Sequence, residues 1–372
     1  MSLRIAIDAS RATAAQPTGT ETYALRLIQT LIQANKNLAQ PFQLRLYFRD
    51  RPAAGLFDHC NYVEQVVIRL PRLWTHLGLA AALWRRHHDI LFVPAHTLPF
   101  VFPGRAMVTT HDLGYKYFPG AHTTWQRFYL NMTTRYSQAR ADIVLADSQA
   151  TANDLTRFYG TSRHNIRIIY PGVDAAPLST SPAHIQAARR KYRLPQRYFL
   201  FLGTLQPRKN ISRLVQAFSH WQATTADKET ALVLAGGRGW LFDKNWLRGA
   251  SNLLSTGYIE GEDKAALLAG ALAMVFPSLH EGFGFPVLEA MHCGTPVIAS
   301  SSSSLPELVG DCGILVDPLD TRAIAAAMRR ISEDAELRSE LGAQGQKRAQ
   351  RFNWESAAAQ VLDAFAELGG SR

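Results

Sequence analysis

Short apolar runs and amphipathic stretches alternate along the chain, and this pattern occurs as two successive series. In the first series, residues 20–34 have apolar side chains at helical spacing, and residues 123–139 form a second helical stretch. Apolar runs typical of buried strands lie at 3–10, 42–48, 65–70, 89–94, 106–112, 141–148 and 165–174. Strands that alternate with helices predict a parallel sheet with helices on its faces.

The second series starts after a polar, alanine-rich stretch at 175–190, which predicts a connector and a short helix. Its strand patterns lie at 198–205, 231–237, 253–259, 273–278, 295–300 and 312–318, and its helical patterns lie at 210–223 and 262–271. Two such series in 372 residues predict two doubly wound α/β domains that face a central cleft. We expect them at 1–173 and 174–352, with a C-terminal helix at 353–372 that packs back towards the first domain.

The composition is that of a globular protein, because 47% of the residues are hydrophobic and 19% are charged. No apolar run reaches the length of about 18 residues that a membrane-spanning helix needs. The opening MSLRIAIDAS enters a strand pattern directly, which argues against a signal peptide. The three cysteines, Cys60, Cys293 and Cys312, lack metal-ligand spacing, so we expect a reduced cytoplasmic protein.

The net charge of +10 is concentrated in the first half of the chain. Residues 1–172 contain 19 Lys and Arg against 10 Asp and Glu, whereas residues 173–372 contain 21 against 20. Such an excess is expected for a domain that meets nucleic acid, an anionic membrane surface or an anionic substrate. A solvated basic face without a partner is the alternative.

Candidate chemistry follows the strands, because ligands of open parallel sheets bind at the carboxyl ends of strands. Gly19 lies just before the first helix, where backbone amides can approach an anion. Its surroundings lack the G-x-G-x-x-G spacing of a dinucleotide site. His111 and Asp112 follow an apolar strand, and a histidine there can donate to a hydroxyl or transfer a proton. A histidine that merely caps the strand end is the alternative.

Arg208 and Lys209 follow a glycine and a proline at the predicted start of a helix. Helix starts usually carry acidic residues, because the helix dipole is positive there. Two adjacent cations at this place fit an anion that docks between them and the helix amides. Two solvated basic residues are the alternative.

The segment HEGFGFPVLEAMHCGTPVIAS at 280–300 carries two glutamates separated by seven residues. Pro286 suits the first turn of a helix and Gly294 its C-terminal cap, so Glu281 precedes the helix and Glu289 lies one turn inside. The amides of the Gly-Phe-Gly turn face whatever lies in front of the helix, which predicts a bound diphosphate with a carboxylate on either side for hydroxyl groups. A preference of acids for helix starts explains Glu281 but leaves the glycines unexplained.

This segment resembles the E-x7-E motif of retaining glycosyltransferases with the GT-B fold, family GT4. The resemblance covers almost the whole chain, through segments such as PTGTETYALRL, THDLGYKYFP, IIYPGVD, FLGTLQPRKNISRLVQAF and SSLPELVGDCGILVDP in the family's order and spacing. It implies a GT-B fold of two Rossmann-like domains, the first for the acceptor and the second for the nucleotide-sugar donor. One position departs from the pattern, since many relatives have an arginine directly after the glycine equivalent to Gly203, where this chain has Thr204.

The resemblance also implies roles. Glu281 would contact hydroxyls of the donor sugar and Glu289 the ribose, while Arg208 and Lys209 would neutralise the departing diphosphate. The residues expected to take part in catalysis are His111, Arg208, Lys209 and Glu281. Those expected to bind substrate are Gly19, Gly203, Tyr258, Gly282, Phe283, Gly284 and Glu289; among them Gly19 would approach the diphosphate and Tyr258 would lie near the base. His111 would lie behind the transferred sugar.

The chemistry of glycosyl transfer agrees with these roles. Negative charge develops on the diphosphate, where preplaced cations and a helix dipole stabilise it. No Asp-x-Asp metal motif stands at a strand end, so we expect no metal and no other cofactor. A covalent glycosyl-enzyme intermediate requires a carboxylate close to the anomeric carbon, and no obvious candidate other than Asp112 lies near His111 in the sequence. We therefore expect front-face transfer, in which the departing phosphate takes the acceptor's proton.

The version G-T-L-x-P-R-K-N with H-D-L-G-Y resembles bacterial mannosyltransferases of O-antigen and exopolysaccharide assembly. This implies GDP-mannose as donor and a glycan or lipid-linked acceptor, with UDP- and dTDP-sugars as alternatives. A nucleotide-sugar 2-epimerase with the GT-B fold is the rival enzyme, and a sugar- or nucleic-acid-binding protein is the rival from another class. No basic-aromatic recognition motif is present, so we expect no nucleic-acid partner.

Residues 69–86 are basic at both ends and apolar between, with Trp74 and Trp84. Together with the basic first half, this predicts peripheral contact with an anionic membrane, on the inner face of the plasma membrane of a cytoplasmic protein. A buried helix with basic ends fits the same pattern.

Overall fold

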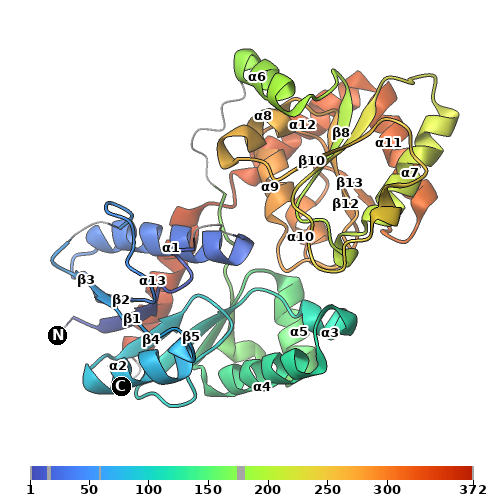
Figure 1. Ribbon diagram of the computed structural model, residues 1–372. Coiled ribbons are helices and arrows are strands. Elements are labelled where there is room, and N and C mark those ends of the chain that lie inside the picture. The colour runs from blue at the N-terminus through green and yellow to red at the C-terminus, as the bar shows by residue number, and fades with distance from the viewer. Residues whose placement is uncertain (1, 15–17, 58–59, 174–180, 371–372) are drawn as a thin grey trace. The chain divides into compact units, whose positions relative to one another are not determined.

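The computed structural model describes residues 2–14, 18–57, 60–173 and 181–370. Its contacts divide the chain into two units, the first with residues 1–172 and 353–372 and the second with residues 173–352. In the first unit the C-terminal helix α13 (Trp354–Gly370) packs along α1 (Gly19–Lys36), although the two are far apart in sequence (Figure 1).

The first unit is built on a seven-stranded parallel sheet with the order β3-β2-β1-β4-β5-β6-β7. Its strands are β1 (Arg4–Asp8), β2 (Gln43–Phe48), β3 (Val63–Val67), β4 (Ile90–Val93), β5 (Arg105–Thr110), β6 (Ile143–Ala146) and β7 (Ile166–Ile168). The strand order reverses between β1 and β4, and such a reversal is where ligands bind in open α/β sheets.

Helices cover both faces of this sheet, so its central strands are apolar at successive positions. They are, besides α1 and α13, α2 (Ala80–Arg85), α3 (Gly114–Tyr117), α4 (Thr124–Arg140) and α5 (Gln149–Tyr159), with turns η1 (Trp74–Leu79), η2 (Pro119–Ala121) and η3 (Arg163–Asn165). Leu91 packs with Leu83 and Leu155 on one face, whereas its neighbour Phe92 contacts Phe365 of α13 on the other.

The second unit repeats the architecture with a six-stranded parallel sheet of order β10-β9-β8-β11-β12-β13. Its strands are β8 (Tyr198–Leu202), β9 (Ala231–Ala235), β10 (Leu253–Gly257), β11 (Ala273–Phe276), β12 (Val297–Ser300) and β13 (Ile314–Val316). The order reverses between β8 and β11. The switch point of this sheet therefore lies between the segments that follow these two strands.

The second sheet is also covered on both faces (Figure 1). Its helices are α6 (Pro182–Tyr192), α7 (Ile211–Thr224), α8 (Lys264–Ala269), α9 (Phe285–His292), α10 (Leu305–Val309), α11 (Thr321–Glu333) and α12 (Ala335–Ala349), with turns η4 (Pro207–Lys209), η5 (Lys244–Leu247) and η6 (Gly261–Asp263). Phe199 of β8 packs against Trp221 of α7, while the hydroxyl of the neighbouring Tyr198 donates to the Leu267 carbonyl of α8 at 2.7 Å.

The chain passes between the units next to Gly172, where it has no room for a side chain. A Cβ on Gly172 would lie 2.3 Å from the backbone nitrogen of Trp354 and 2.6 Å from the carbonyl carbon of Asn353. One residue on, the Val173 amide donates to the Phe352 carbonyl at 3.4 Å. The two places where the chain passes from one unit to the other therefore contact each other along the backbone.

Several strands are shorter than the apolar runs that predicted them. The run at 165–174 gives only β7, because Pro171 cannot donate to a sheet ladder. The run at 198–205 gives a strand that stops at Leu202, since Gly203 has a φ of +148°. Within the segment 69–86, Trp74 lies in the core and Trp84 is exposed, and the expected membrane contact stays a prediction.

Candidate active site

The predicted donor-site residues lie at the switch point of the second sheet. Gly203 follows β8, and the segment up to Glu281 follows β11. The strand ends are closely packed here, because a Cβ on Gly236 after β9 would lie 2.0 Å from the carbonyl oxygen of Gly203. Tyr258 directly follows β10 at the same edge of the sheet, and its side chain is 68% exposed.

Arg208 and Lys209 lie in the 3-10 turn η4 and not, as the sequence suggested, in the first turn of the helix. The helix α7 begins only at Ile211, because Asn210 adopts a left-handed conformation with a φ of +62°. The Asn210 side chain donates to the carbonyls of Pro277 at 3.0 Å and Pro318 at 2.6 Å. This amide ties the connection after β8 to the segments that follow β11 and β13.

The carboxylate of Glu281 holds both cations, although 72 residues separate it from Lys209. Lys209 Nζ donates to Oε1 at 2.6 Å, and Arg208 Nη1 donates to Oε2 at 2.9 Å and to the His280 carbonyl at 2.9 Å. The Ser278 hydroxyl also donates to the carboxylate. The structure thus brings three of the expected catalytic residues together as a buried ion-pair cluster.

This cluster is ionised at neutral pH. Burial acts to raise the pKa of Glu281, but the charges of Arg208 and Lys209 and the hydrogen bonds from Lys209 and Ser278 outweigh it and lower the pKa below 4.5. Lys209 Nζ also lies 4.7 Å from the centre of the Phe276 ring, a cation–π distance. Two cations and one carboxylate leave the cluster with a net charge of +1.

Serines that follow β12 hold the Glu281 loop in place. The Glu281 amide donates to Ser303 Oγ at 3.2 Å, and Ser304 Oγ donates to the carbonyls of Glu281 at 3.0 Å and Phe283 at 2.9 Å. These serines were not among the residues expected in the site. Their only signal was a run of hydroxyl side chains directly after a predicted strand.

The Gly-Phe-Gly turn has a strict requirement for its second glycine. Gly284 has a φ of +111° before α9, and a Cβ there would lie 2.7 Å from Leu305 Cδ2. The ring of Phe283 is buried against Phe285 and Phe352, so its side chain is part of the core. The expected role of Gly282, Phe283 and Gly284 through their backbone amides stays a prediction.

Glu289 lies one turn into α9, and its Oε1 accepts a hydrogen bond from Lys264 Nζ at 2.7 Å. Lys264 is the first residue of α8 and was not among the expected site residues. Gly19 is the first residue of α1, in the first unit, after the N-cap Thr18 and its capping box with Glu21. Residues 15–17 of that loop lie outside the described residues.

His111 follows β5 in the first unit, and both of its ring nitrogens face acceptors. Nδ1 lies 2.6 Å from Asp147 Oδ2, and Nε2 lies 3.3 Å from the Pro94 carbonyl. Burial lowers the pKa of His111, but the charge and hydrogen bond of Asp147 and the Pro94 carbonyl raise it above 6.5 overall. Both ring nitrogens of His111 are thus engaged, and a protonated ring would donate to both acceptors. Asp147 was not recognised, although it follows a predicted strand.

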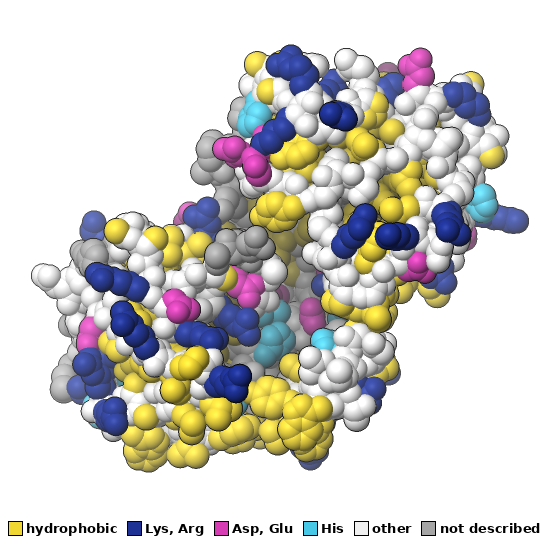
Figure 2. All heavy atoms as spheres, in the orientation of Figure 1, with side chains coloured by type: hydrophobic (Ala, Val, Ile, Leu, Met, Phe, Trp, Pro, Cys, Tyr) yellow, Lys and Arg dark blue, Asp and Glu magenta, His cyan; other side chains and the backbone are white. Residues whose placement is uncertain are grey.

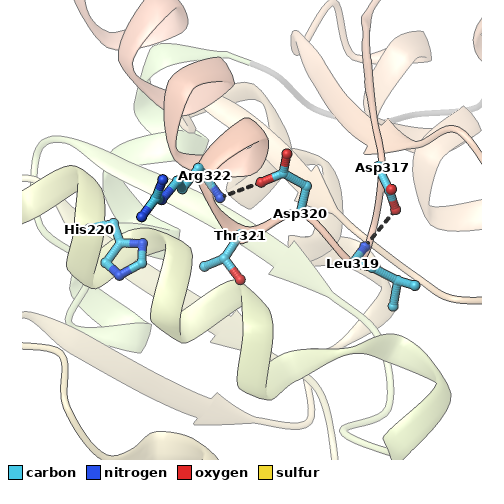
Figure 3. A pocket seen from close by; sticks show the side chains of 6 residues that line it. All are labelled: His220, Asp317, Leu319, Asp320, Thr321 and Arg322. Carbon is cyan, nitrogen blue, oxygen red and sulfur yellow. Dashed lines mark hydrogen bonds between the residues drawn. The ribbon is translucent and has the colours of Figure 1, made fainter.

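A cavity of about 470 Å³ lies elsewhere in the second unit, between α7 and the start of α11 (Figure 3). It is lined by His220, Asp317, Leu319, Asp320, Thr321 and Arg322. The two aspartates accept hydrogen bonds from the backbone of their own turns, at 2.8 Å each, and none of the expected site residues lines the cavity (Figure 3). Across the described residues, no group of three or more His, Cys, Asp and Glu side chains is placed to hold a metal ion.

Comparison with known proteins identifies the family. Residues 17–176 match Glycosyltransferase Family 4, and residues 185–348 match the Glycosyl transferases group 1. The O-antigen chain mannosyltransferase B of Escherichia coli is 34% identical over 267 residues, which is 70% of each chain. The chain belongs to glycosyltransferase family 4. The serotype-specific mannosyltransferase WbdA of Escherichia coli is 32% identical over 253 residues, and the match spans 66% of this family 4 chain but only 31% of WbdA.

Solved structures share the fold of this glycosyltransferase. Sucrose-phosphate synthase from Thermosynechococcus elongatus matches with a TM-score of 0.77 and 23% identity over 100% of both chains. HepE of Anabaena, in complex with UDP-glucose, matches with a TM-score of 0.74 and 18% identity over 98% of this chain and 100% of HepE. WaaG, a glycosyltransferase involved in lipopolysaccharide biosynthesis, matches with a TM-score of 0.72 and 16% identity over 97% of this chain and 99% of WaaG. The expected GT-B fold of two Rossmann-like domains is confirmed.

Proposed function

We propose that this family 4 glycosyltransferase transfers an α-mannosyl group from GDP-mannose, with retention, to a hydroxyl of a glycan or lipid-linked acceptor in cell-surface polysaccharide biosynthesis. The observation that carries the proposal is the Arg208–Lys209–Glu281 cluster at the switch point of the second sheet, in front of α9. The similarity to O-antigen mannosyltransferases supports the choice of sugar.

In the proposed reaction, the bond between the sugar's anomeric carbon and the diphosphate breaks as the acceptor oxygen bonds to that carbon on the same face. The acceptor's proton passes to the departing phosphate, which leaves as GDP. Arg208 and Lys209 stabilise the charge that develops on the phosphate, and they are already held in place by Glu281. Glu281 and Glu289 accept hydrogen bonds from the sugar and the ribose, and this chemistry requires no metal.

Calorimetry of the full chain against GDP, UDP, dTDP and ADP, with EDTA present, tests the donor site. GDP is expected to bind most tightly. Arg208→Ala removes a charged hydrogen-bond donor to the diphosphate, so it should weaken GDP about 10- to 100-fold. Glu289→Ala should weaken it less, and Lys347→Ala, on the exposed side of α12, should change nothing. Preferred binding of UDP or dTDP would change the donor, and binding of none, with EDTA or with magnesium, would refute the site.

The products test the reaction class. An α-mannoside and free GDP in equal amounts are expected from GDP-mannose and an α-mannosyl acceptor. An epimerised nucleotide sugar without transfer would support the 2-epimerase, and a trapped glycosyl-enzyme adduct would rule out front-face transfer. Proton NMR of the anomeric signals separates these results.

We also infer a peripheral membrane contact from an exposed apolar region of the first unit, here called the aromatic surface. It consists of Leu73, Leu77, Phe100, Val101, Trp125, Phe128, Tyr129 and Met132. Four of these lie on one face of α4 at spacings of three and four residues, and Trp125 is 73% exposed. His76 joins them to η1, since its ring stacks on Phe100 and its Nε2 lies 2.9 Å from the Tyr129 hydroxyl. Figure 2 shows hydrophobic side chains gathered in this part of the first unit, with Lys and Arg side chains nearby.

Such a surface, in the half of the chain that carries the positive charge, fits the interface of an anionic bilayer. No helix in the described part of the chain is long and apolar enough to cross a membrane. In a co-sedimentation assay, the protein is expected in the pellet with vesicles of phosphatidylglycerol and phosphatidylcholine. The double change Trp125→Ser/Phe128→Ser should leave it in the supernatant. The control Leu241→Ser alters an exposed leucine of the second unit and should still bind. Equal binding by all three proteins would contradict the inference.

A further inference from the structure

The first sheet has its own switch point, and a histidine without an assigned role lies there. The strand order reverses between β1 and β4, and His96 follows β4 by three residues. Its side chain is partly buried, and within the described residues no hydrogen bond or ion pair reaches it. Ligands of open α/β sheets bind at this kind of position.

His96 contacts His111, and the pKa values of the two rings are shifted in opposite directions. Their centres are 5.4 Å apart with the ring planes at 68°. Asp147 and the Pro94 carbonyl raise the pKa of His111. Burial, with smaller contributions from the charges of His111 and Arg11, lowers the pKa of His96 to about 4 although Asp112 opposes the shift, so His96 is neutral at pH 7.

A neutral imidazole carries one donor and one acceptor, and this matches a hydroxyl group, which also donates and accepts. His111 lacks this capacity, because Asp147 and the Pro94 carbonyl already engage both of its nitrogens. The charges that act on His96 are those of His111, Asp112 and Arg11, and Arg11 pairs with Glu21 at 3.2 Å. The neutral ring of His96 therefore suits an uncharged polar ligand such as a sugar hydroxyl.

We propose that His96 binds a hydroxyl of the acceptor sugar at the switch point of the first sheet. This rests on the proposed function, in which the second unit binds the donor through Arg208, Lys209 and Glu281. His96 is a binding residue here. The proton of the reacting hydroxyl still goes to the departing phosphate.

Steady-state kinetics of the full chain with GDP-mannose and octyl α-mannobioside test the proposal. His96→Ala should raise the KM for the mannobioside at least tenfold, while the KM for GDP-mannose, the Kd for GDP and the slow hydrolysis of GDP-mannose without acceptor stay within twofold of wild type. His96→Asn, which keeps a donor and an acceptor, should recover part of the loss. The control His164→Ala alters an exposed histidine of the same unit and should behave as wild type.

A second measurement needs no donor. In protein labelled with 13C at histidine Cε1, the signal that disappears in His96→Asn identifies His96, and octyl α-mannobioside should shift it in a saturable way. An unshifted signal together with an unchanged KM for the mannobioside would overturn the proposal. A fall in GDP-mannose hydrolysis in His96→Ala would also overturn it, by placing the residue at the donor sugar. A shifted signal in a protein that binds no GDP would refute the proposed donor and leave the His96 site standing.

Discussion

Replacement of Glu281 by glutamine tests whether the ion-pair cluster of the second unit is a structural as well as a chemical device. Glu281→Gln keeps the shape of the side chain and removes its charge. Lys209, whose side chain is 8% exposed, and Arg208, at 22%, then lose the carboxylate that they share. The loss of one partner from a buried pair costs about 3–5 kcal/mol, and the partial exposure of Arg208 places the expected loss at about 3 kcal/mol.

The pH dependence has a definite sign. The pKa of folded Glu281 is below 4.5, so its charge stabilises the fold fully above the unfolded value and this stabilisation is lost as the pH falls through the folded pKa. The difference in unfolding free energy between wild type and Glu281→Gln should therefore be complete at pH 7 and shrink below about pH 4. A difference in unfolding free energy that stays the same at low pH would point to lost packing instead of lost charge.

Urea unfolding at 25 °C, followed by tryptophan fluorescence, gives the magnitude. Glu289→Gln is the matched control, because its partner Lys264 is 37% exposed and the pair should contribute no more than about 1 kcal/mol. The double change Glu281→Gln/Lys209→Met should recover about 1–2 kcal/mol relative to Glu281→Gln, since it removes the more deeply buried unpaired cation. A loss below about 1 kcal/mol for Glu281→Gln would refute the reasoning.

Two further changes test other parts of the fold. Gly172→Ala should destabilise the protein by about 3 kcal/mol in urea unfolding, because its Cβ would overlap the backbone of Trp354, whereas Gly120→Ala, with open space around it, should cost less than about 0.5 kcal/mol. Asp147→Asn should lower the pKa of His111 in an NMR titration, since the carboxylate holds it above 6.5; an unchanged pKa would show that Asp147 is not the cause of the raised value. The raised pKa means that this pair stabilises the fold below pH 6.5 and that the stabilisation fades as the pH rises through the folded value.

The sequence predicted the strands and most helices because hydrophobic periodicity records local burial, as in β8, which is apolar at every position. Turn chemistry predicted Pro286 and Gly294 at the two ends of α9, and Gly294 has a φ of +71°. The start of α7 was predicted too early. The neighbouring sequence does not indicate that Asn210 adopts a left-handed conformation, in which its side chain donates to the carbonyl of Pro318.

The sequence did not predict which side chains pair with each other within the sites. Lys264 meets Glu289, and Asp147 meets His111, through pairings 25 and 36 residues apart that only the strand order decides. The apolar face of α4 was also missed, because periodicity identifies an apolar stripe without saying whether a sheet or solvent lies against it. Trp125 and Phe128 are exposed, although their spacing alone is typical of a core-facing helix.

The pairing of Glu281 with Arg208 and Lys209 bears on how the proposed reaction would be catalysed. Long cationic side chains without a partner sample many rotamers, and their ordering at each encounter would take free energy from donor binding. A buried carboxylate that accepts from both at 2.6 and 2.9 Å keeps them in place beforehand, and the remaining charge of +1 still favours an anion. In the proposed reaction, Glu281 would act on the diphosphate through the two cations, as well as on the sugar directly. A change at Glu281 should thus alter both the affinity for GDP and the rate of transfer, whereas a change at His96 should alter neither GDP affinity nor donor hydrolysis.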